Sequence, residues 1–253
     1  MTDDDRYLPA LRFSFLNGVY DPVVALTSRE NRFKSALLAG VAMEAGQKVL
    51  DVGCGTGTLA CMLARKEAAA DVHGLDGDAD MIARSGAKAS EMGVRANFLQ
   101  GMSSHLPYPD AYFDHVVSSL FFHHLGTDAK EATLAEMLRV MKPGGRLHIA
   151  DWGAPHDPLM RIAFLAVQLF DGFRTTSDNV RGRLPAMTSW AGFSDVEVDG
   201  RFRTLLGTLE ILRSTKPLVS RSSRTGPSGL SARTAPNPCP TGAGGPVSRH
   251  PSD

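Results

Sequence analysis

With 253 residues, the chain is long enough for one large domain or two small ones. Lysine plus arginine and aspartate plus glutamate number 27 each, and the resulting net charge of zero disfavours nucleic-acid binding as the main function. The three cysteines, Cys54, Cys61 and Cys239, form neither a metal-ligand spacing nor a disulfide framework, so we predict a reducing cytoplasmic location and no metal site.

The N-terminal region shows no signal-peptide pattern, because its first ten residues are acidic and lack an apolar core. No run of about 18 uninterrupted apolar residues occurs, so no membrane-spanning segment is predicted. Residues 1–27 contain scattered aromatic side chains, among them Tyr20, and we expect them to form a cap over a ligand cleft. A helix is predicted from Thr27 or Ser28 to about Ala45.

The stretch VLDVGCGTGTLA combines a strand, a glycine-rich turn and the start of a helix. Val49–Val52 is typical of a short buried strand, and Thr58–Ala64 follows as a helix. Gly53, Gly55 and Gly57 allow the backbone to turn sharply and to approach a ligand closely. Because a helix N-terminus presents free N–H groups and partial positive charge, this arrangement favours an anionic or polar ligand.

Asp51 indicates which kind of ligand the loop binds. A dinucleotide fingerprint is G-x-G-x-x-G, whereas this loop is G-x-G-x-G with Asp51 two residues before its first glycine. A carboxylate there would repel a pyrophosphate and suit an ammonium group, such as the amino acid end of S-adenosylmethionine. The segment, which fits hhDhGCGxG, resembles motif I of the class I S-adenosylmethionine-dependent methyltransferases. The alternative is an ordinary strand-to-helix turn of an α/β protein.

A second strand is predicted at Asp71–Asp76 and ends in an acid. A carboxylate at the tip of such a strand can accept both hydroxyls of a ribose, so Asp76 is the second predicted ligand residue. The alternative for Asp76 is a solvated turn aspartate. Asp78 is expected to cap the next helix, whose Met81 and Ile82 would face inward.

The third strand is predicted at Arg95–Gln100, and the loop GMSSHLPYPD after it resembles the adenine-side loop of the same family. The family usually has an acid directly after the glycine, where this chain has Met102. The expected carboxylate contact to the adenine amino group is therefore missing. Ser103, Ser104 and backbone groups are left to replace it.

Two histidines follow the predicted fourth strand, Tyr112–Ser118. His123 and His124 come directly after its carboxyl end, where open α/β sheets have their ligand crevice. A histidine there could hydrogen-bond a substrate or accept a proton from it. The alternative is that one ring packs against the next helix and the other caps a backbone carbonyl.

The middle of the chain continues the alternation of helix and strand. A helix from Thr127 or Asp128 to Met141 is predicted to end at KPGG, and RLHIAD to form a fifth strand. Pro158–Phe173 is predicted as one helix, apolar nearly all round. It must be covered, and the candidates are the N-terminal cap, a second subunit, an apolar substrate or a membrane surface.

The C-terminal part is predicted to close the sheet. The polar segment RTTSDNVRGR is expected to be a linker, followed by a helix near residues 185–191. Two strands, at about 194–199 and 202–212, would then be joined by Asp199 and Gly200. From residue 214 onward the chain is rich in Pro, Ser, Gly and Arg, so residues 214–253 are predicted to be a disordered tail.

Together these elements predict an α/β fold, namely a Rossmann-like seven-stranded sheet, mostly parallel with a C-terminal antiparallel hairpin, and helices on both faces. Residues 1–213 would form the methyltransferase domain, with the cap at about 1–27 and a lid or insert at about 155–190. The antiparallel hairpin distinguishes this sheet from the all-parallel dinucleotide-binding fold.

Residues 1–213 resemble the small-molecule branch of the class, in particular the UbiE-like quinone C-methyltransferases. The resemblance implies transfer of a methyl group from S-adenosylmethionine to a small, apolar acceptor, with S-adenosylhomocysteine as the product. Competing hypotheses are a phospholipid amine N-methyltransferase, a protein that binds the donor without turnover, and a nicotinamide-dependent oxidoreductase. The expected partner is a small molecule and not a nucleic acid, while a peripheral membrane contact and a homodimer stay open.

The resemblance also implies the site residues. Those expected to hold the cofactor are Asp51, Gly53, Gly55, Gly57, Asp76, Gly77, Met102, Ser103 and Ser118. Candidates for catalysis on the acceptor side are Tyr20, His123 and His156, with Asp151 and Trp152 beside them.

Overall fold

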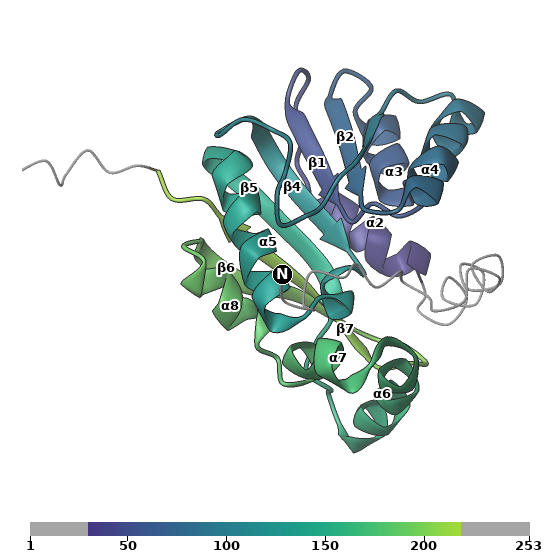
Figure 1. The fold of residues 1–253 in the computed structure, drawn as a ribbon, viewed down its shortest axis with the longest axis vertical. Coiled ribbons are helices and arrows are strands. Elements are labelled where there is room, and N and C mark those ends of the chain that lie inside the picture. The colour runs from purple at the N-terminus through teal and green to yellow at the C-terminus, as the bar shows by residue number, and fades with distance from the viewer. Residues whose placement is uncertain (1–29, 219–253) are drawn as a thin grey trace, which may run out of the picture. The chain divides into compact units, whose positions relative to one another are not determined.

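The computed structural model describes residues 30–218, in which strands and helices alternate along the chain (Figure 1). The strands are β1 (Lys48–Val52), β2 (Asp71–Asp76), β3 (Asn97–Gln100), β4 (Phe113–Ser119), β5 (Met141–Trp152), β6 (Ser194–Arg203) and β7 (Thr208–Thr215). The helices are α2 (Glu30–Gly40), α3 (Thr58–Lys66), α4 (Ala79–Met92), α5 (Thr127–Val140), α6 (Pro158–Asp171), α7 (Phe173–Val180), α8 (Leu184–Trp190) and the 3-10 helix η3 (Phe122–His124). The predicted cap with Tyr20 and most of the predicted tail, residues 219–253, lie outside the described residues. Ser214 and Thr215, which were predicted to begin the tail, instead belong to β7, because they pair with β5 and β6.

The strands form one sheet in the order β3-β2-β1-β4-β5-β7-β6. β1 to β5 are mutually parallel, and β7 runs antiparallel to both of its neighbours, β5 and β6. The chain leaves β1 toward β3 and then returns to β4 on the other side of β1, so the strand order reverses between β1 and β4. Open α/β sheets bind ligands at such a reversal, beyond the carboxyl ends of the strands. The predicted fold class is confirmed.

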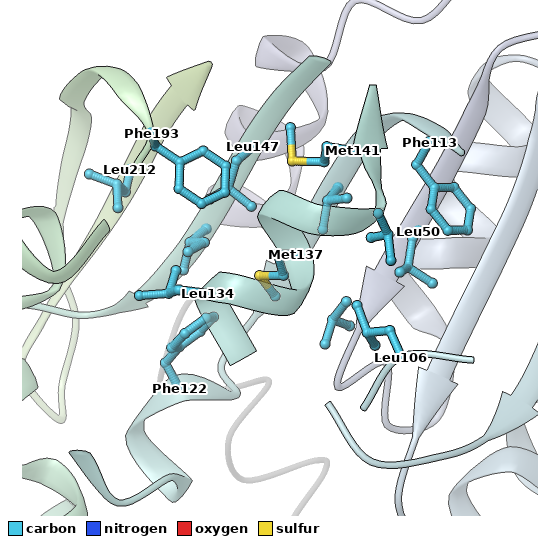
Figure 2. Close-up of a cluster of buried hydrophobic side chains, with 14 of the residues drawn as sticks. Leu50, Leu106, Phe113, Phe122, Leu134, Met137, Met141, Leu147, Phe193 and Leu212 are labelled. Carbon is cyan, nitrogen blue, oxygen red and sulfur yellow. The ribbon is translucent and has the colours of Figure 1, made fainter. Parts of the chain in front are cut away.

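Two buried apolar clusters lie on opposite faces of the sheet, because successive side chains of a strand point to opposite sides. On one face, Leu134 and Met137 of α5 pack with Leu50 and Leu147 of the strands, and α8 joins the same cluster (Figure 2). On the other face, Val49 belongs to a cluster built with α2, α3 and α6. Leu50 and Val49 are neighbours in β1, so this strand is covered on both sides.

The segment KPGG, Lys142–Gly145, does not end a helix as predicted. α5 ends at Val140, and KPGG lies inside β5. Phe113 of β4 pairs with Met141, but His115 pairs with Arg146, so the extra residues form a bulge. The proline and the two glycines interrupt the pairing with β4 without ending the strand.

The turn of the C-terminal hairpin lies further along the chain than predicted. Residues 204–207 join β6 to β7, whereas Asp199 and Gly200 lie within β6, where its register with β7 shifts. Gly207 has a φ of +147°, a value that side chains disfavour, and its carbonyl accepts a hydrogen bond from the Thr204 N–H at 2.9 Å. The tight turn is therefore formed by the second glycine of this region.

The predicted helix Pro158–Phe173 is divided into two by Gly172, whose φ is +95°. α6 ends at Asp171, and most of the predicted polar linker is the helix α7. The polar side chains of Thr176, Asp178 and Asn179 are buried in α7. The segment was predicted as a linker because its composition is polar. Composition alone does not reveal that these polar side chains have partners in the interior.

α6 has one packed and one exposed face. Its inner side chains, including Phe164 and Val167, belong to the same buried cluster as Val49. Six large apolar side chains of α6 and the first turn of α7 are mostly exposed, namely Leu159, Ile162, Leu165, Leu169, Phe170 and Phe173. Within residues 30–218, no helix is both long enough and apolar enough to cross a membrane.

Two helices near the N-terminus also differ from the prediction. α2 ends at Gly40 and not near Ala45. In α4, Met81 and Ile82 are only half-buried, and the buried residues are Ser85 and Ala89. Small side chains face inward because α4 approaches the N-terminal end of α3 closely.

Candidate active site

Three glycines shape the loop between β1 and α3. Gly53, Gly55 and Gly57 have φ values of +70°, +52° and +73°, in the left-handed region that glycine adopts without strain. A side chain at Gly53 would overlap the ring of Phe121, and a Cβ at Gly57 would lie 2.6 Å from the Cβ of Ser85. A Cβ at Gly55 would meet nothing within 4 Å. The loop is thus packed at its two ends and open at its centre.

Asp51 lies in β1, just before this loop, and its carboxylate is buried. The residue is 1% exposed, and within residues 30–218 neither carboxylate oxygen accepts a well-formed hydrogen bond, although the Ala60 N–H at the start of α3 is close enough to lower its pKa. Burial raises the pKa of Asp51 to about 7, although the nearby charge of Lys34 opposes the shift. Because buried polar groups normally have partners, this carboxylate points to a ligand that carries a positive donor.

Asp76, the last residue of β2, links the glycine loop to α4. Its Oδ2 accepts a hydrogen bond from the Gly55 N–H at 2.8 Å, and its Oδ1 accepts one from the Asp78 N–H at 3.0 Å. Burial raises the pKa of its carboxyl group. Each oxygen keeps a second lone pair for a ligand hydroxyl. The prediction that Asp78 caps α4 is confirmed, because its Oδ1 accepts from the Asp80 N–H at 2.8 Å.

The residues predicted beside the adenine and the sulfonium differ in what their side chains contact. Met102 is 46% exposed. The Ser103 hydroxyl lies 2.8 Å from that of Thr133 in α5, at a buried position. The Ser118 hydroxyl is fully buried and donates to the Val52 carbonyl at 2.8 Å. Both serines therefore form hydrogen bonds within the fold, and their contact with a cofactor stays a prediction. The Gly77 carbonyl accepts a hydrogen bond from the Gln100 side chain.

His123 and Asp151, both predicted on the acceptor side, form a buried pair. His123 Nδ1 donates to Asp151 Oδ1 at 2.8 Å. The other oxygen of Asp151 accepts from the Phe121 N–H at 3.0 Å, which joins this pair to the residue that packs on Gly53. Burial alone would lower the pKa of His123, but the charge of Asp151 raises it above its usual value. The pair is thus attached to the donor loop through Phe121.

Of the other acceptor-side candidates that the structure describes, Trp152 contacts His123 and His156 does not. The ring of Trp152 lies edge-on to His123, with centroids 6.3 Å apart. His156 contacts Thr208 of β7, whose hydroxyl lies 2.8 Å from its Nδ1. No contact joins His156 to His123 in the described part of the chain. Tyr20 lies outside the described residues.

The structure adds site residues that the sequence did not single out. Phe121 covers Gly53, and Lys34 of α2 places a charge near Asp51. Asn179 of α7 donates to the Trp152 carbonyl at 2.9 Å and lies 3.3 Å from Asp151 Oδ1. Asp171 ends α6, close to His123 and His124. One signal for Asp171 was present, since it is the single acid in an apolar helix.

Gly53→Ala is expected to destabilise the protein more than Gly55→Ala, which serves as the matched control. Both changes place a side chain at a positive φ, at a cost of about 1–2 kcal/mol. Only at position 53 does the new methyl group overlap the ring of Phe121, which adds about 1–3 kcal/mol for overpacking. Urea unfolding measures the two free energies. Equal losses would show that Phe121 moves aside without resistance.

Comparison with known protein families identifies the part of the chain that holds this site. Residues 49–145 match the family described as "Methyltransferase domain". This stretch is a methyltransferase domain. It begins at β1 and ends in the bulge of β5, so it contains the glycine loop, Asp76 and the two adjacent histidines.

Curated relatives of the domain include quinone methyltransferases. A demethylmenaquinone methyltransferase of Thermus thermophilus is 36% identical over 112 residues, which are 44% of this chain and 50% of that protein. The methyltransferase GfsG of Streptomyces halstedii is 35% identical over 156 residues, 58% of this chain and 55% of that one. The chain spans about half the length of these two relatives. The predicted resemblance to UbiE-like methyltransferases is confirmed for the domain.

Solved structures show how widely the fold of the methyltransferase domain is used. YcgJ of Bacillus subtilis superposes with a TM-score of 0.60 at 18% identity, over 74% of this chain and 99% of that one. The protein titled [4+2]-cyclase SpnF has a TM-score of 0.58 at 21% identity, over 74% and 80% of the two chains. At these identities the likeness concerns the fold alone.

Proposed function

We propose that the protein transfers the methyl group of S-adenosylmethionine to a small, apolar acceptor by C- or O-methylation. The observation that carries this proposal is the buried carboxylate of Asp51, which accepts no well-formed hydrogen bond in residues 30–218 and lies beside a left-handed glycine loop. An ammonium group would supply hydrogen-bond donors to the carboxylate and would add positive charge to that of the nearby Lys34. A diphosphate would supply neither.

The other donor-site residues fit the same cofactor. The loop leads into α3, and its N-cap residue Gly57 has no side chain to cap the first turn, so free N–H groups of that turn suit the carboxylate of the amino acid end. Asp76 keeps lone pairs for the ribose hydroxyls, and Met102 offers an exposed apolar side chain for the adenine. When bound, the cofactor supplies a methyl group on an activated leaving group. The protein then has to align the acceptor and exclude water.

On the acceptor side, the residues favour an apolar molecule with one polar group. Trp152 lies edge-on to His123 and packs on Phe164 at a ring distance of 5.5 Å, and both rings are nearly completely buried, so the surroundings of His123 are largely apolar. Asp151 holds the proton of His123 on Nδ1, which leaves the Nε2 lone pair available for one further partner. Two relatives are named as quinone methyltransferases, a demethylmenaquinone methyltransferase and the ubiquinone/menaquinone biosynthesis C-methyltransferase UbiE, and they support an acceptor of this class.

The activity is tested by incubating purified protein with methyl-labelled donor and, separately, with quinol and phospholipid extracts. Label in the quinol fraction is the expected result, and label in phospholipid would favour the amine N-methyltransferase instead. Donor binding is measured on the same preparation by calorimetry. Donor binding without transfer to any acceptor would identify a protein that binds the cofactor without turnover, and the absence of binding would contradict the proposal.

Asp76→Ala is expected to weaken donor binding at least tenfold, which corresponds to about 1.4 kcal/mol. The change removes the carboxylate proposed to bind the ribose and also releases the Gly55 N–H that it holds. Asp78→Ala is the matched control, because Asp78 lies two residues further on and its side chain caps α4 by accepting a hydrogen bond from the Asp80 N–H, not from the glycine loop. Calorimetry gives both affinities. Equal affinities for the two variants would show that Asp76 does not contact the donor.

A further inference from the structure

Two histidines and an aspartate come together beside the Asp151 carboxylate. His123 and His124 belong to η3, and Asp171 is the last residue of α6. One ligand atom from each side chain can be chosen so that all three lie within 4.8 Å of one another. The side chains of His123 and Asp171 are almost completely buried, and that of His124 is 21% exposed. We propose that these three residues bind a divalent transition-metal ion, with zinc as the first candidate.

The gaps between these side chains are too long for hydrogen bonds and suit a metal ion. His123 Nε2 lies 3.7 Å from Asp171 Oδ2, and His124 Nδ1 lies 3.7 Å from Asp171 Oδ1. In a tetrahedral zinc site the metal is about 2.0–2.2 Å from each nitrogen or oxygen ligand, so neighbouring ligand atoms are roughly 3.4 Å apart. The two histidine–aspartate separations are close to this value, and the two histidine nitrogens, which lie within 4.8 Å of each other, would complete the set.

Asp151 orients the ring of His123 for metal binding through Nε2. It accepts the Nδ1 proton of His123 at 2.8 Å, which places the lone pair of the ring on Nε2, the atom that faces Asp171. Metal-binding histidines almost always have such a carboxylate or carbonyl behind them, where it fixes the tautomer and the ring orientation. Asp151 is thus a positioning residue for the proposed site.

The local charge also favours a cation. Asp151 and Asp171 place two carboxylates beside the histidines in a buried region. The buried lysine on this side, Lys130, donates to the Thr175 carbonyl at 2.6 Å and lies 3.5 Å from Asp178. Its charge also reaches His123 and Asp151, but its nearest acid is Asp178. A divalent ion between His123 and Asp171 would balance the two carboxylates.

The ligand set indicates which ions suit the site. Two imidazoles and one carboxylate are ligands for zinc and other first-row transition metals, whereas magnesium and calcium prefer oxygen ligands throughout. Three protein ligands leave at least one coordination position open. If the proposed methyl transfer is correct, an acceptor oxygen at that position would lose its proton to solvent more readily.

Metal binding is tested on the full-length chain without an added histidine tag, after treatment with a chelator and dialysis. Titration with ZnCl2 is expected to show one tight equivalent, and CoCl2 to give the visible absorption of four- or five-coordinate cobalt. His124→Ala and Asp171→Asn should each weaken binding at least tenfold. His105→Ala is the matched control, because His105 is exposed and hydrogen-bonds only with the neighbouring Ser104 among the assigned contacts.

Two results would overturn the site: no zinc equivalent together with no cobalt absorption, or equal binding by the wild type and both ligand variants. X-ray absorption of the zinc-loaded wild type gives a reading that does not depend on the folding of any variant, and a spectrum without two imidazole ligands would also overturn it. Donor calorimetry on the same samples separates the two proposals. Metal binding without donor binding would reject only the proposed function, and donor binding without metal binding would reject only this site.

Discussion

Replacing Asp51 with asparagine is expected to weaken binding of S-adenosylmethionine by about 30- to 150-fold at pH 7.5, or about 2–3 kcal/mol. Asparagine has nearly the same shape, but it carries no charge to pair with an ammonium group. The wild-type affinity should rise between pH 6 and pH 7.5, because the pKa of Asp51 is about 7 and only the ionised form attracts the cofactor. The affinity of the variant should not follow this rise. Calorimetry at several pH values measures both.

The same substitution is expected to change the stability of the ligand-free protein in the opposite direction. The pKa of Asp51 is higher in the folded protein, about 7, than its ordinary value of 3.8, so its contribution to stability is fully present below pH 4 and is lost as the pH rises through 7. The variant lacks this loss. Its free energy of unfolding should therefore improve relative to the wild type between pH 4 and pH 8, by on the order of 4 kcal/mol at most. A constant difference across this range would show that Asp51 is solvated in the free protein.

Replacing Asp151 with alanine is expected to lower the free energy of unfolding by about 3–5 kcal/mol, the range seen when one partner of a buried charge pair is removed. The carboxylate accepts hydrogen bonds from the ring of His123 and from the Phe121 and Trp152 N–H groups. The change leaves these three donors buried without an acceptor, and such donors are costly. Urea unfolding near pH 7 measures the loss.

Glu197→Ala is the matched control for Asp151→Ala. Glu197 pairs with Arg213 at 3.2 Å, but both side chains are largely exposed, at 65% and 41%. An exposed pair of this kind contributes about 0–1 kcal/mol. If the two variants lost similar amounts of stability, Asp151 would not be the centre of a buried network.

Features that depend on neighbouring residues in the sequence were predictable. β2 begins and ends at Asp71 and Asp76 as predicted, because an apolar run between two polar turns defines a strand locally. The cap at Asp78 and the glycine loop were likewise encoded in short patterns. Family resemblance added the expected roles of Asp51 and Asp76, whose positions in the structure fit a donor site.

Features that depend on distant residues were not predictable. The polar run that forms α7 resembles a linker in composition, and only the fold shows that Asn179 meets Asp151 and that Lys130 meets the Thr175 carbonyl. Likewise, Gly200 and Gly207 could each form the turn between β6 and β7. The pairing of β7 with β5 and β6 determines that the turn lies at Gly207. Asp171 is 47 positions away from His124 in the sequence, so their proximity follows from the path of α6 and not from a motif.

The place of β7 in the sheet also affects how the chain can fold during synthesis. β7 follows β6 in the sequence but lies between β5 and β6 in the sheet (Figure 1). On the ribosome, β6 therefore emerges before the strand that joins it to the rest of the molecule, and β5 keeps an open edge until then. Unpaired strand edges are prone to aggregation. A nascent chain that stalls before Thr208 would consequently depend on chaperones, even though residues 49–145, the stretch that matches the methyltransferase family, have already been translated.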